Sequence, residues 1–503
     1  MSDVRGYIIA MMVAVVLSAV DIAYETAHLQ DNASVLEAVL AISTANRHAT
    51  FPEPYENLDE ILRRFMTQNL DADRDSVIAE RIAQYRELDM TRPVELTHEE
   101  IIYELDFLFN VLRYGYPAYQ YFGGDEVFLP LKEIMLEELA QMTNPLSADA
   151  YLAHLLQPFL RSVIIDNHFW IDHHPMGVGS QQYMNDNLVI RKVDLDFLVE
   201  IDGMKYKILY VTHPDGHEIE GLLPTLTRDG EFAWAFGYVD FLITAWQPTF
   251  EITVNLENID TGENNVRTVS LTPIPNANVS NDIFATRERQ GITILENRRL
   301  PFSDAEPLVL EFVDTGATLR DEPILILDLR GHRGGIDGYT FQWIYQYTGQ
   351  NPNFHMMFTH IRLYSKTVNA IAVGMEAVSP PDWQIWGDSS EHGFIQNENF
   401  LIVLMDNAIG STGDVFVGYL RQLENVLFVG ANTGGVLITG NVGGITLPLS
   451  RFDVNFGVSL NIRPDLSQFE GVGFMPDLWV PPQDALERVL KFIERYDILE
   501  EMQ

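Results

Sequence analysis

Three short runs of apolar residues constrain the fold of this chain most. They are Ile324-Leu-Ile-Leu-Asp-Leu329, Phe400-Leu-Ile-Val-Leu-Met405 and Val426-Leu-Phe-Val429. Runs this short and this continuous are typical of strands that are buried on both faces of a sheet. Segments that suit helices lie between them, over residues 338–347 and 414–423. The alternation of strand, turn and helix therefore predicts an α/β layer domain over residues 286–503.

The chain before this domain predicts two further units, because 503 residues are enough for two or three cores. Residues 31–175 indicate a helical cap domain, in which Thr97-His-Glu-Glu100 forms a capping box before an apolar stripe and a second helix begins near Ser147. Residues 176–285 contain short alternating runs, such as 206–212 and 250–256, between Asp-Gly and Thr-Gly turn signals. They predict a β-rich middle domain, PDZ-like or degenerate. The expected fold class is multidomain α/β.

The first 30 residues are expected to be a signal peptide or a membrane anchor. Tyr7 to Val20 is an uncharged run of 14 residues that follows Arg5 and ends at Asp21. That length suits the apolar part of a signal peptide and is short of the roughly 20 residues of a membrane-spanning helix. The pattern predicts an extracytoplasmic protein, secreted or membrane-anchored. A buried terminal helix is the alternative.

Charge and cysteine content exclude several classes of function. The chain has 32 basic and 72 acidic residues, a net charge of −40, which repels nucleic acid phosphates. It has no cysteine, which excludes disulfides, thiolate metal sites and cysteine nucleophiles. Catalysis would have to use hydroxyl, carboxylate, imidazole or amine groups. No cofactor is expected.

Two glycine-containing turns follow the buried strands. The first, Asp328-Leu-Arg-Gly-His-Arg-Gly-Gly335, can present backbone N–H groups as an oxyanion hole does, or it is an ordinary strand-to-helix turn. The second, residues 406–416, places Ser411 at the start of a helix, where the amide dipoles favour a developing negative charge. Serine is also a preferred N-cap residue, so capping alone would explain Ser411.

Together these turns resemble those of the tail-specific and tricorn-type serine peptidases, which show Asp-Leu-Arg-Gly-x-x-Gly-Gly and later Ser-x-x-Glu/Asp before an apolar residue and Phe. Two more segments match in the same order, Phe428-Val-Gly-Ala-Asn-Thr-Gly-Gly435 and Glu470-Gly-Val-Gly-Phe-Met-Pro-Asp477. The resemblance covers about residues 290–490. It implies a crotonase/ClpP-like catalytic domain that hydrolyses peptide bonds of polypeptide substrates through a serine acyl-enzyme.

The resemblance also assigns roles to residues of this chain. Ser411 would be the nucleophile, and the oxyanion hole would use the amides of Thr412 and of Gly334 or Gly335. Glu470, 59 positions after Ser411, would orient the base or the attacking chemistry.

The general base is where the sequence departs from the family. The lysine of the Ser–Lys branch is replaced by Val436, and the histidine of the tricorn-like branch by Tyr116. His168 is the candidate base, although a structural place in the cap explains it as well. A tyrosine of ordinary pKa, near 10, is a poor base at pH 7.

Other interpretations remain. The chain could be a degenerate relative that binds peptides or proteins without cleaving them, since Val436 and Tyr116 replace the bases of the family. A third interpretation is an unrelated crotonase-like acyl enzyme. Ser411 and residues 470–477 disfavour it. His168, Asp172, His173 and His174 invite a metal interpretation, but their spacing matches no standard zinc signature, so no metal site is predicted. His332 either lines the site or is a solvated loop side chain.

Overall fold

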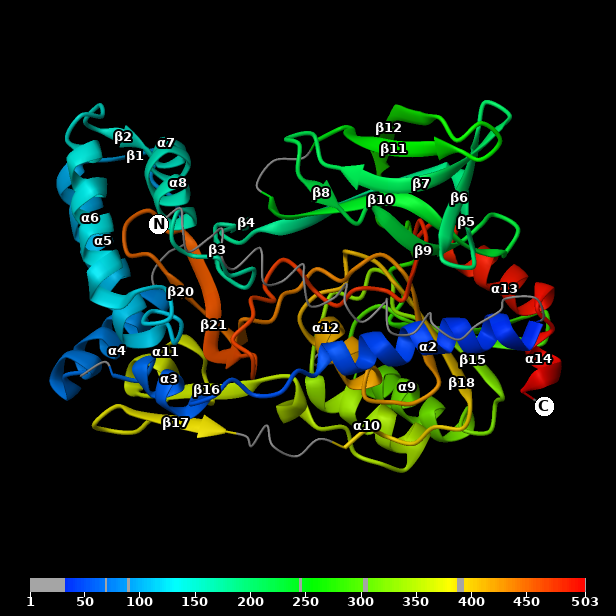
Figure 1. Cartoon of the computed structure of the whole chain (residues 1–503). Helices are drawn as coiled ribbons and strands as arrows, with labels where there is room; N and C mark the ends of the chain where they lie inside the picture. The colour runs from blue at the N-terminus through cyan, green and yellow to red at the C-terminus, as the bar shows by residue number, and fades with distance from the viewer. Residues whose placement is uncertain are drawn as a thin grey trace.

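The structure, a computed structural model, describes residues 32–67, 70–87, 91–243, 247–301, 306–386 and 393–502. It is a mixed α/β protein, with helices near the N-terminus, an antiparallel sheet in the middle and a mixed sheet in the C-terminal part (Figure 1). The run Tyr7 to Val20 lies outside the described residues. Within these ranges no helix has the length and apolar character needed to cross a membrane.

The three predicted apolar strands are confirmed at the centre of the C-terminal sheet. The sheet has the order β13 (Phe284–Arg289), β14 (Ile292–Asn297), β15 (Ile324–Asp328), β18 (Phe400–Met405), β19 (Val426–Gly430), β22 (Leu478–Trp479). All neighbours from β14 onward are parallel, and only β13 is antiparallel. Every residue of β15, β18 and β19 is buried. Such strands need cover on both faces.

Helices and the middle sheet supply that cover. On one face, α9 (Glu306–Thr318), α10 (Asp337–Thr348) and α12 (Thr412–Leu420) pack against side chains such as Leu325 and Leu327. On the other face Ile324 and Ile326 share a core with α2 (Asn32–Thr50), α13 (Ala485–Arg495) and the middle sheet. The short α14 (Ile498–Glu501) follows α13. The helices predicted over 338–347 and 414–423 are thus confirmed as α10 and α12.

The β-rich character of the middle region is confirmed as one sheet in which five strands close on themselves. Its order is β12-β11-β7-β6-β5-β10-β9, β8 pairs with β7, and β12 also pairs with β5. The strands are β5 (Gly179–Val193), β6 (Asp196–Ile201), β7 (Met204–Thr212), β8 (Glu218–Ile219), β9 (Leu222–Leu226), β10 (Phe232–Ile243), β11 (Phe250–Asn258) and β12 (Asn264–Pro273). The extra β12–β5 pairing leaves β5, β6, β7, β11 and β12 in a closed ring.

Helices in the N-terminal part are confirmed, together with the capping box: Thr97 accepts from the Glu100 amide, and the Glu100 side chain accepts from the Thr97 amide. Ser147 likewise caps the second predicted helix. The helical elements are α3 (Leu58–Arg64), α4 (Ala72–Arg86), α5 (His98–Gly115), α6 (Gly124–Leu139), α7 (Ala148–Tyr151), a π-helical turn (Leu152–Leu156) and α8 (Gln157–Arg161). A two-stranded pair, β1 (Glu95–Leu96) and β2 (Leu146–Ser147), joins them.

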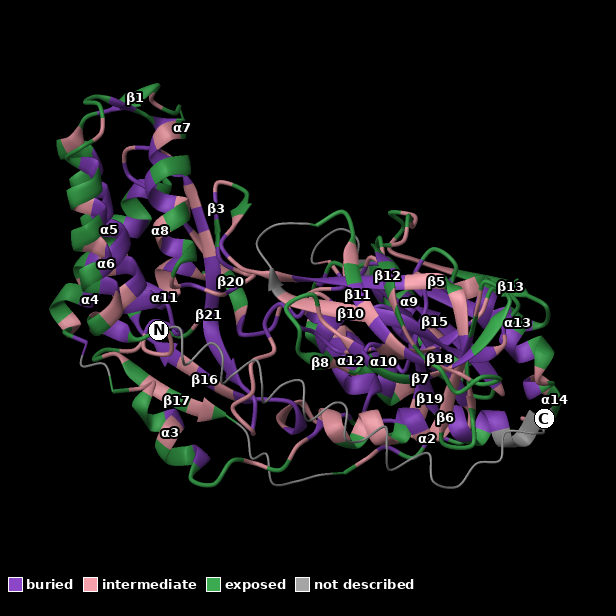
Figure 2. Ribbon diagram, turned by 45° about the horizontal axis from the view of Figure 1, so that its top comes forward, coloured by how far each residue is buried: buried purple, intermediate pink, exposed green. Residues whose placement is uncertain are grey.

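The cap core is completed by residues from the other end of the chain. A second sheet has the order β17 (Asp382–Trp386), β16 (Thr359–Tyr364), β21 (Asp453–Ile462), β3 (Trp170–Ile171), β4 (His174–Pro175), and β20 (Thr439–Thr446) also pairs with β21. A short 3₁₀ helix (Phe354–Met356) and α11 (Lys366–Ile371) flank β16. Buried residues of this sheet and of the cap helices form one core (Figure 2). The β3–β21 pairing thereby fixes the loop just before β3, which carries His168, against the C-terminal part of the chain.

A buried ion pair fastens α2 to the C-terminal sheet rather than to the cap. Asp477, at the start of β22, accepts from Arg421 Nη1 at 2.6 Å, from the Phe428 amide at 2.8 Å and from Asn46 of α2 at 2.9 Å. The Arg421 and Asp477 side chains are 2% and 0% exposed, and the guanidinium lies 3.8 Å from the centre of the Phe428 ring.

We expect Arg421→Met to lower the free energy of unfolding by about 3–5 kcal/mol, because it leaves the Asp477 carboxylate buried without its cation. Denaturant unfolding followed by circular dichroism measures the change. Arg64→Met is the matched control, since Arg64 and Glu60 form a pair of which both side chains are 68% exposed. Its expected effect is below about 1 kcal/mol. Equal effects of the two substitutions would contradict the prediction.

Candidate active site

Ser411 lies in the sharp turn between β18 and α12, in a strained backbone conformation. Its φ and ψ are 56° and −123°, a combination that L-residues rarely adopt and that costs about 1–3 kcal/mol. Its side chain makes no capping hydrogen bond to α12, so N-capping does not account for this serine. The residue is half-buried, and its hydroxyl faces a neighbouring imidazole. Strain of this kind is characteristic of exposed nucleophiles at the end of a strand.

His168 supplies that imidazole, from the loop between α8 and β3. Its Nε2 lies 3.0 Å from Ser411 Oγ, within hydrogen-bond reach for a proton transfer. Burial lowers the pKa of His168 from its ordinary 6.5, while the charge of Asp166 and, more weakly, the backbone of Thr439 and the charge of Asp337 raise it. The ring is therefore neutral at neutral pH, as a general base must be.

The other ring nitrogen of His168, Nδ1, is buried and has no hydrogen-bond partner among the described residues. A proton on Nδ1 would leave the Nε2 lone pair for the serine hydroxyl, as the proposed role of the ring requires.

Tyr116, at the position where the tricorn-like branch has histidine, does not contact Ser411. It is 1% exposed, and its hydroxyl donates to Asp166 Oδ2 at 2.7 Å. Burial, followed by the charge of Asp166 and the hydrogen bond to it, raises the pKa of Tyr116 well above 10. A phenol of that pKa cannot serve as the base. Asp166 also accepts from the His168 amide at 2.9 Å and from the Thr439 hydroxyl at 2.9 Å, so it holds the histidine loop in place.

Glu470 positions the same loop from the other side. Its carboxylate accepts from the amides of Asn167, Leu437 and Ile438 at 2.6, 2.8 and 2.7 Å. In the described part of the chain it bonds neither to Ser411 nor to His168. Burial, and after it the charge of Asp166, raises the pKa of Glu470 well above its ordinary value. Glu470 therefore acts through the backbone around His168 and is a positioning residue.

Of the three amides predicted for the oxyanion hole, two are available. The Gly334 amide donates to His332 Nδ1 at 3.1 Å. The amides of Gly335 and Thr412 make no hydrogen bond to any residue that the structure describes. Gly335 is exposed with φ 143°, and its carbonyl accepts from the Thr412 hydroxyl at 2.8 Å, which joins the two turns. Gly335 and Thr412 thus offer two N–H donors beside Ser411.

His332 is not a solvated side chain, because the structure buries it completely. Burial lowers the pKa of His332 to about 3, so the ring is neutral. Its Nδ1 accepts from Gly334, and its carbonyl accepts from the Gly410 amide at 3.0 Å. His332 therefore fastens the glycine turn to the turn of Ser411.

Two carboxylates near Ser411 were missed by sequence reasoning. Asp414 accepts from the amides of Gly435 and Val436, and burial raises its pKa to about 6. Asp337, at the start of α10, is an exposed residue whose Oδ1 lies 2.5 Å from the Thr412 hydroxyl, so Asp337 and the Gly335 carbonyl share the single proton of that hydroxyl. Burial raises the pKa of Asp337. Asp414 lies three residues after Ser411 in a motif already identified, but Asp337 has no local signal beyond its place at a helix start.

The residues considered for a metal on the exposed side of the cap do not converge. Asp172 accepts from Arg92 Nη1 at 2.7 Å, and His173 and His174 are exposed. His168 is occupied with Ser411. The described residues contain no group of three ligating side chains here.

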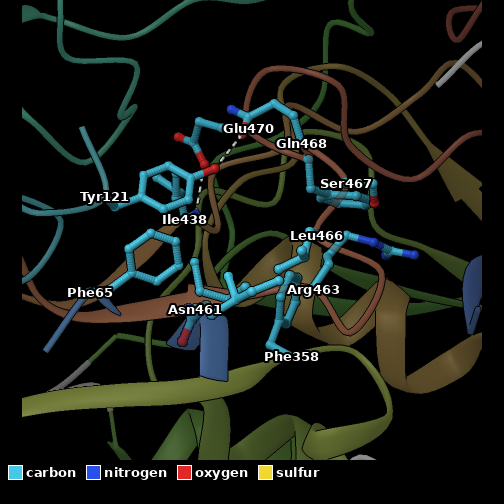
Figure 3. A pocket seen from close by; sticks show the side chains of 13 residues that line it. Phe65, Tyr121, Phe358, Ile438, Asn461, Arg463, Leu466, Ser467, Gln468 and Glu470 are labelled. Atoms are coloured by element: carbon cyan, nitrogen blue, oxygen red, sulfur yellow. Dashed lines mark hydrogen bonds between the residues drawn. The ribbon is translucent and has the colours of Figure 1, made fainter. Parts of the chain in front are cut away.

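Glu470 also lines a pocket of about 190 Å³ (Figure 3). Aromatic side chains line much of it, namely those of Phe65, Tyr121, Phe358 and Phe469. Tyr121 Oη donates to Gln468 Oε1 at its rim at 3.2 Å. Neither Ser411 nor His168 lines this pocket, so it adjoins the positioning residue and not the reacting atoms.

Comparison with known proteins gives similarity in structure alone. No protein-family model matches the sequence, and no curated protein does. Among solved structures, mature CPAF is 14% identical with a TM-score of 0.41, and the alignment covers 80% of this chain and 96% of that one. The photosystem II D1 C-terminal processing protease is 13% identical with a TM-score of 0.34, over 78% and 97% of the two chains. Tricorn protease is 13% identical with a TM-score of 0.34, over 80% of this chain and 37% of its own.

The similar structures thus include a C-terminal processing protease and the tricorn protease. This similarity is one of backbone fold. What the site can do chemically follows from the distances and contacts of its own residues.

Gly335→Ala tests the glycine turn. A Cβ at Gly335 would lie 1.9 Å from the Leu300 carbonyl oxygen, and φ is positive, so the turn must shift and carry the Gly335 amide away from Ser411. We expect the rate of modification of Ser411 by a fluorophosphonate to fall by about 10²–10³-fold, the cost of losing one oxyanion donor.

Gly338→Ala, three residues on, is the matched control. Its Cβ would meet only the Ile336 side chain, at 4.0 Å, so its rate should equal that of the unsubstituted protein. Circular dichroism verifies that both variants are folded. A folded Gly335→Ala variant that reacts at the normal rate would exclude this amide from the oxyanion hole.

Proposed function

We propose that this chain is a serine peptidase of the tail-specific type, which hydrolyses peptide bonds of polypeptide substrates in a crotonase/ClpP-like catalytic domain. The observation that carries the proposal is the 3.0 Å contact between His168 Nε2 and Ser411 Oγ at a strained strand-to-helix turn. It supplies the general base that Val436 and Tyr116 cannot supply. The apolar run Tyr7 to Val20 supports export to an extracytoplasmic location as part of the same proposal.

The acylation step follows from these atoms. Ser411 Oγ attacks the scissile carbonyl carbon while His168 Nε2 takes the hydroxyl proton. The carbonyl oxygen becomes an oxyanion that accepts from the amides of Gly335 and Thr412. His168 then gives the proton to the leaving amine as the C–N bond breaks, and an ester on Ser411 remains.

Deacylation repeats these roles with water. His168 Nε2 removes a proton from the water, whose oxygen attacks the ester carbonyl, and the same two amides stabilise the second oxyanion. The proton returns to Ser411 Oγ as the C–O bond breaks, which releases a carboxylic acid. Asp166 and Glu470 hold the His168 loop through its backbone amides throughout.

The first test is labelling of the purified protein with a fluorophosphonate, which reacts only with an activated serine. We expect the protein to be labelled, Ser411→Ala to abolish labelling, and His168→Ala to slow it by about 10²–10⁴-fold, the usual contribution of a general base. Tyr116→Phe is the discriminating variant: it removes the phenol but no base, so labelling should persist.

Labelling that survives Ser411→Ala would show that another residue reacts. Loss of labelling in a folded Tyr116→Phe variant, with normal labelling in His168→Ala, would make Tyr116 the base and overturn the assignment. A folded protein that is not labelled at any pH from about 6 to 9 would favour the second interpretation, a peptide-binding relative without activity.

The pH dependence of labelling tests the state of His168. The base works only when neutral, and burial lowers its pKa from 6.5, so the rate constant should be at its plateau at pH 7 and should fall on acidification with a midpoint below 6.5. Asp337 raises the pKa of His168, so Asp337→Asn should shift that midpoint to still lower pH. A midpoint above pH 7 would contradict the assignment of His168.

A further inference from the structure

Three potential metal ligands lie together in the hairpin between β7 and β8, far from Ser411 in the sequence. The turn reads His213-Pro214-Asp215-Gly216-His217. The His213 amide donates to the His217 carbonyl at 2.8 Å, and the Gly216 amide donates to the His213 carbonyl at 2.9 Å. Gly216 has φ 97°, which glycine adopts at little cost. The backbone thus holds both histidines at the two ends of one closed turn.

The two imidazoles face the same carboxylate oxygen. Their rings stack with centroids 4.6 Å apart and planes at 24°. His217 Nδ1 lies 2.6 Å from Asp215 Oδ1, and His213 Nδ1 also contacts that oxygen. The ligand atoms of all three side chains lie within 4.8 Å of one another.

The first histidine is fixed by its surroundings. The rings of Tyr238 on β10 and Phe250 on β11 pack against the His213 ring, with distances between ring centroids of 5.3 and 5.2 Å. The His213 side chain is 19% exposed, whereas those of Asp215 and His217 are 63% and 59% exposed. One ligand is therefore held rigidly by the sheet, and the other two face solvent, from which an ion can enter.

The tautomers of the two rings decide what can lie at the point where these atoms meet. With the proton of each neutral ring on Nδ1, both rings donate to Asp215 Oδ1 and no ion is needed. With the protons on Nε2, the two Nδ1 lone pairs and the carboxylate oxygen face one point, which a divalent ion can occupy. The Asp215 amide donates to His213 Nδ1 at 3.3 Å, so this nitrogen serves as an acceptor, as the second arrangement requires.

We propose that His213, Asp215 and His217 bind one divalent transition-metal ion of the zinc class, with water completing the coordination. Two imidazole nitrogens and one carboxylate are ligands that suit zinc and its neighbours, whereas magnesium and calcium prefer sites of oxygen alone. Coordination distances of about 2.0–2.2 Å require the three atoms to spread around a central ion, and the Asp215 and His217 side chains are exposed enough to rotate. The ion would fasten the β7–β8 hairpin, independently of the proposed peptidase site.

Calorimetric titration of the untagged protein, first treated with a chelator, with Zn²⁺ tests the site. We expect one Zn²⁺ per chain, no response to Mg²⁺, and binding weakened at least about tenfold in His217→Ala and in Asp215→Asn. His174→Ala is the matched control, because His174 is an exposed histidine outside the cluster, and it should bind as the unsubstituted chain does. Co²⁺ should give visible absorption bands of a bound ion that His217→Ala removes.

The outcomes separate this proposal from that of the peptidase. Fluorophosphonate labelling of Ser411 should be the same in His217→Ala as in the unsubstituted chain, which also shows that the variant is folded. Zn²⁺ binding that is unchanged in both His217→Ala and Asp215→Asn, or no binding at micromolar Zn²⁺, would overturn the proposed site whatever the result for Ser411.

Discussion

Three backbone amides donate to one buried carboxylate, that of Glu470, and the candidate site depends on this interaction. The amide of Asn167 comes from the loop of His168, and those of Leu437 and Ile438 come from the segment that leads into β20. Residues more than 260 positions apart are thereby held at one point. Beside this anchor, the short β3–β21 pairing and the hydrogen bonds of Asp166 to the His168 amide and the Thr439 hydroxyl hold the same loop. A carboxylate that satisfies several backbone donors tolerates little displacement of any of them.

The two halves of the Ser411–His168 pair are supported by different parts of the molecule. Ser411 lies at the end of β18, a fully buried central strand of a sheet that is covered on both faces. His168 belongs to a loop that the cap and the second antiparallel sheet enclose. The pair thus forms only when the cap is docked on the C-terminal sheet. Because β3, β4, β20 and β21 all belong to the sheet that completes the cap, that docking is part of the fold itself.

Features that depend on interactions between residues close in the sequence could be predicted. A continuous apolar run is stable only as a strand covered on both faces, and the three runs form β15, β18 and β19. The Thr97–Glu100 capping box begins α5, because its hydrogen bonds lie within one helical turn. Such local patterns could not identify the side chain that contacts Ser411. Whether His168 or Tyr116 faces the serine depends on how the cap docks. The hydrogen bond between Tyr116 and Asp166, for example, joins residues 50 positions apart. For the same reason the sequence does not show that β3 and β4 join β21, or that α2 packs on the C-terminal sheet. Asp337 could not be identified from its neighbours, since its role comes from Thr412, 75 residues away.

The charges around the pair bear on the direction in which the proposed reaction would move the proton. Proton transfer from Ser411 would make His168 positive, and Asp166 and Asp337 are the two carboxylates whose charges favour that state. The oxyanion would form at the amides of Gly335 and Thr412, where a nearby negative charge would oppose it. Burial raises the pKa of both Asp166 and Asp337, which favours their neutral forms. The protonation states of these two carboxylates therefore set how far the site favours the imidazolium over the oxyanion.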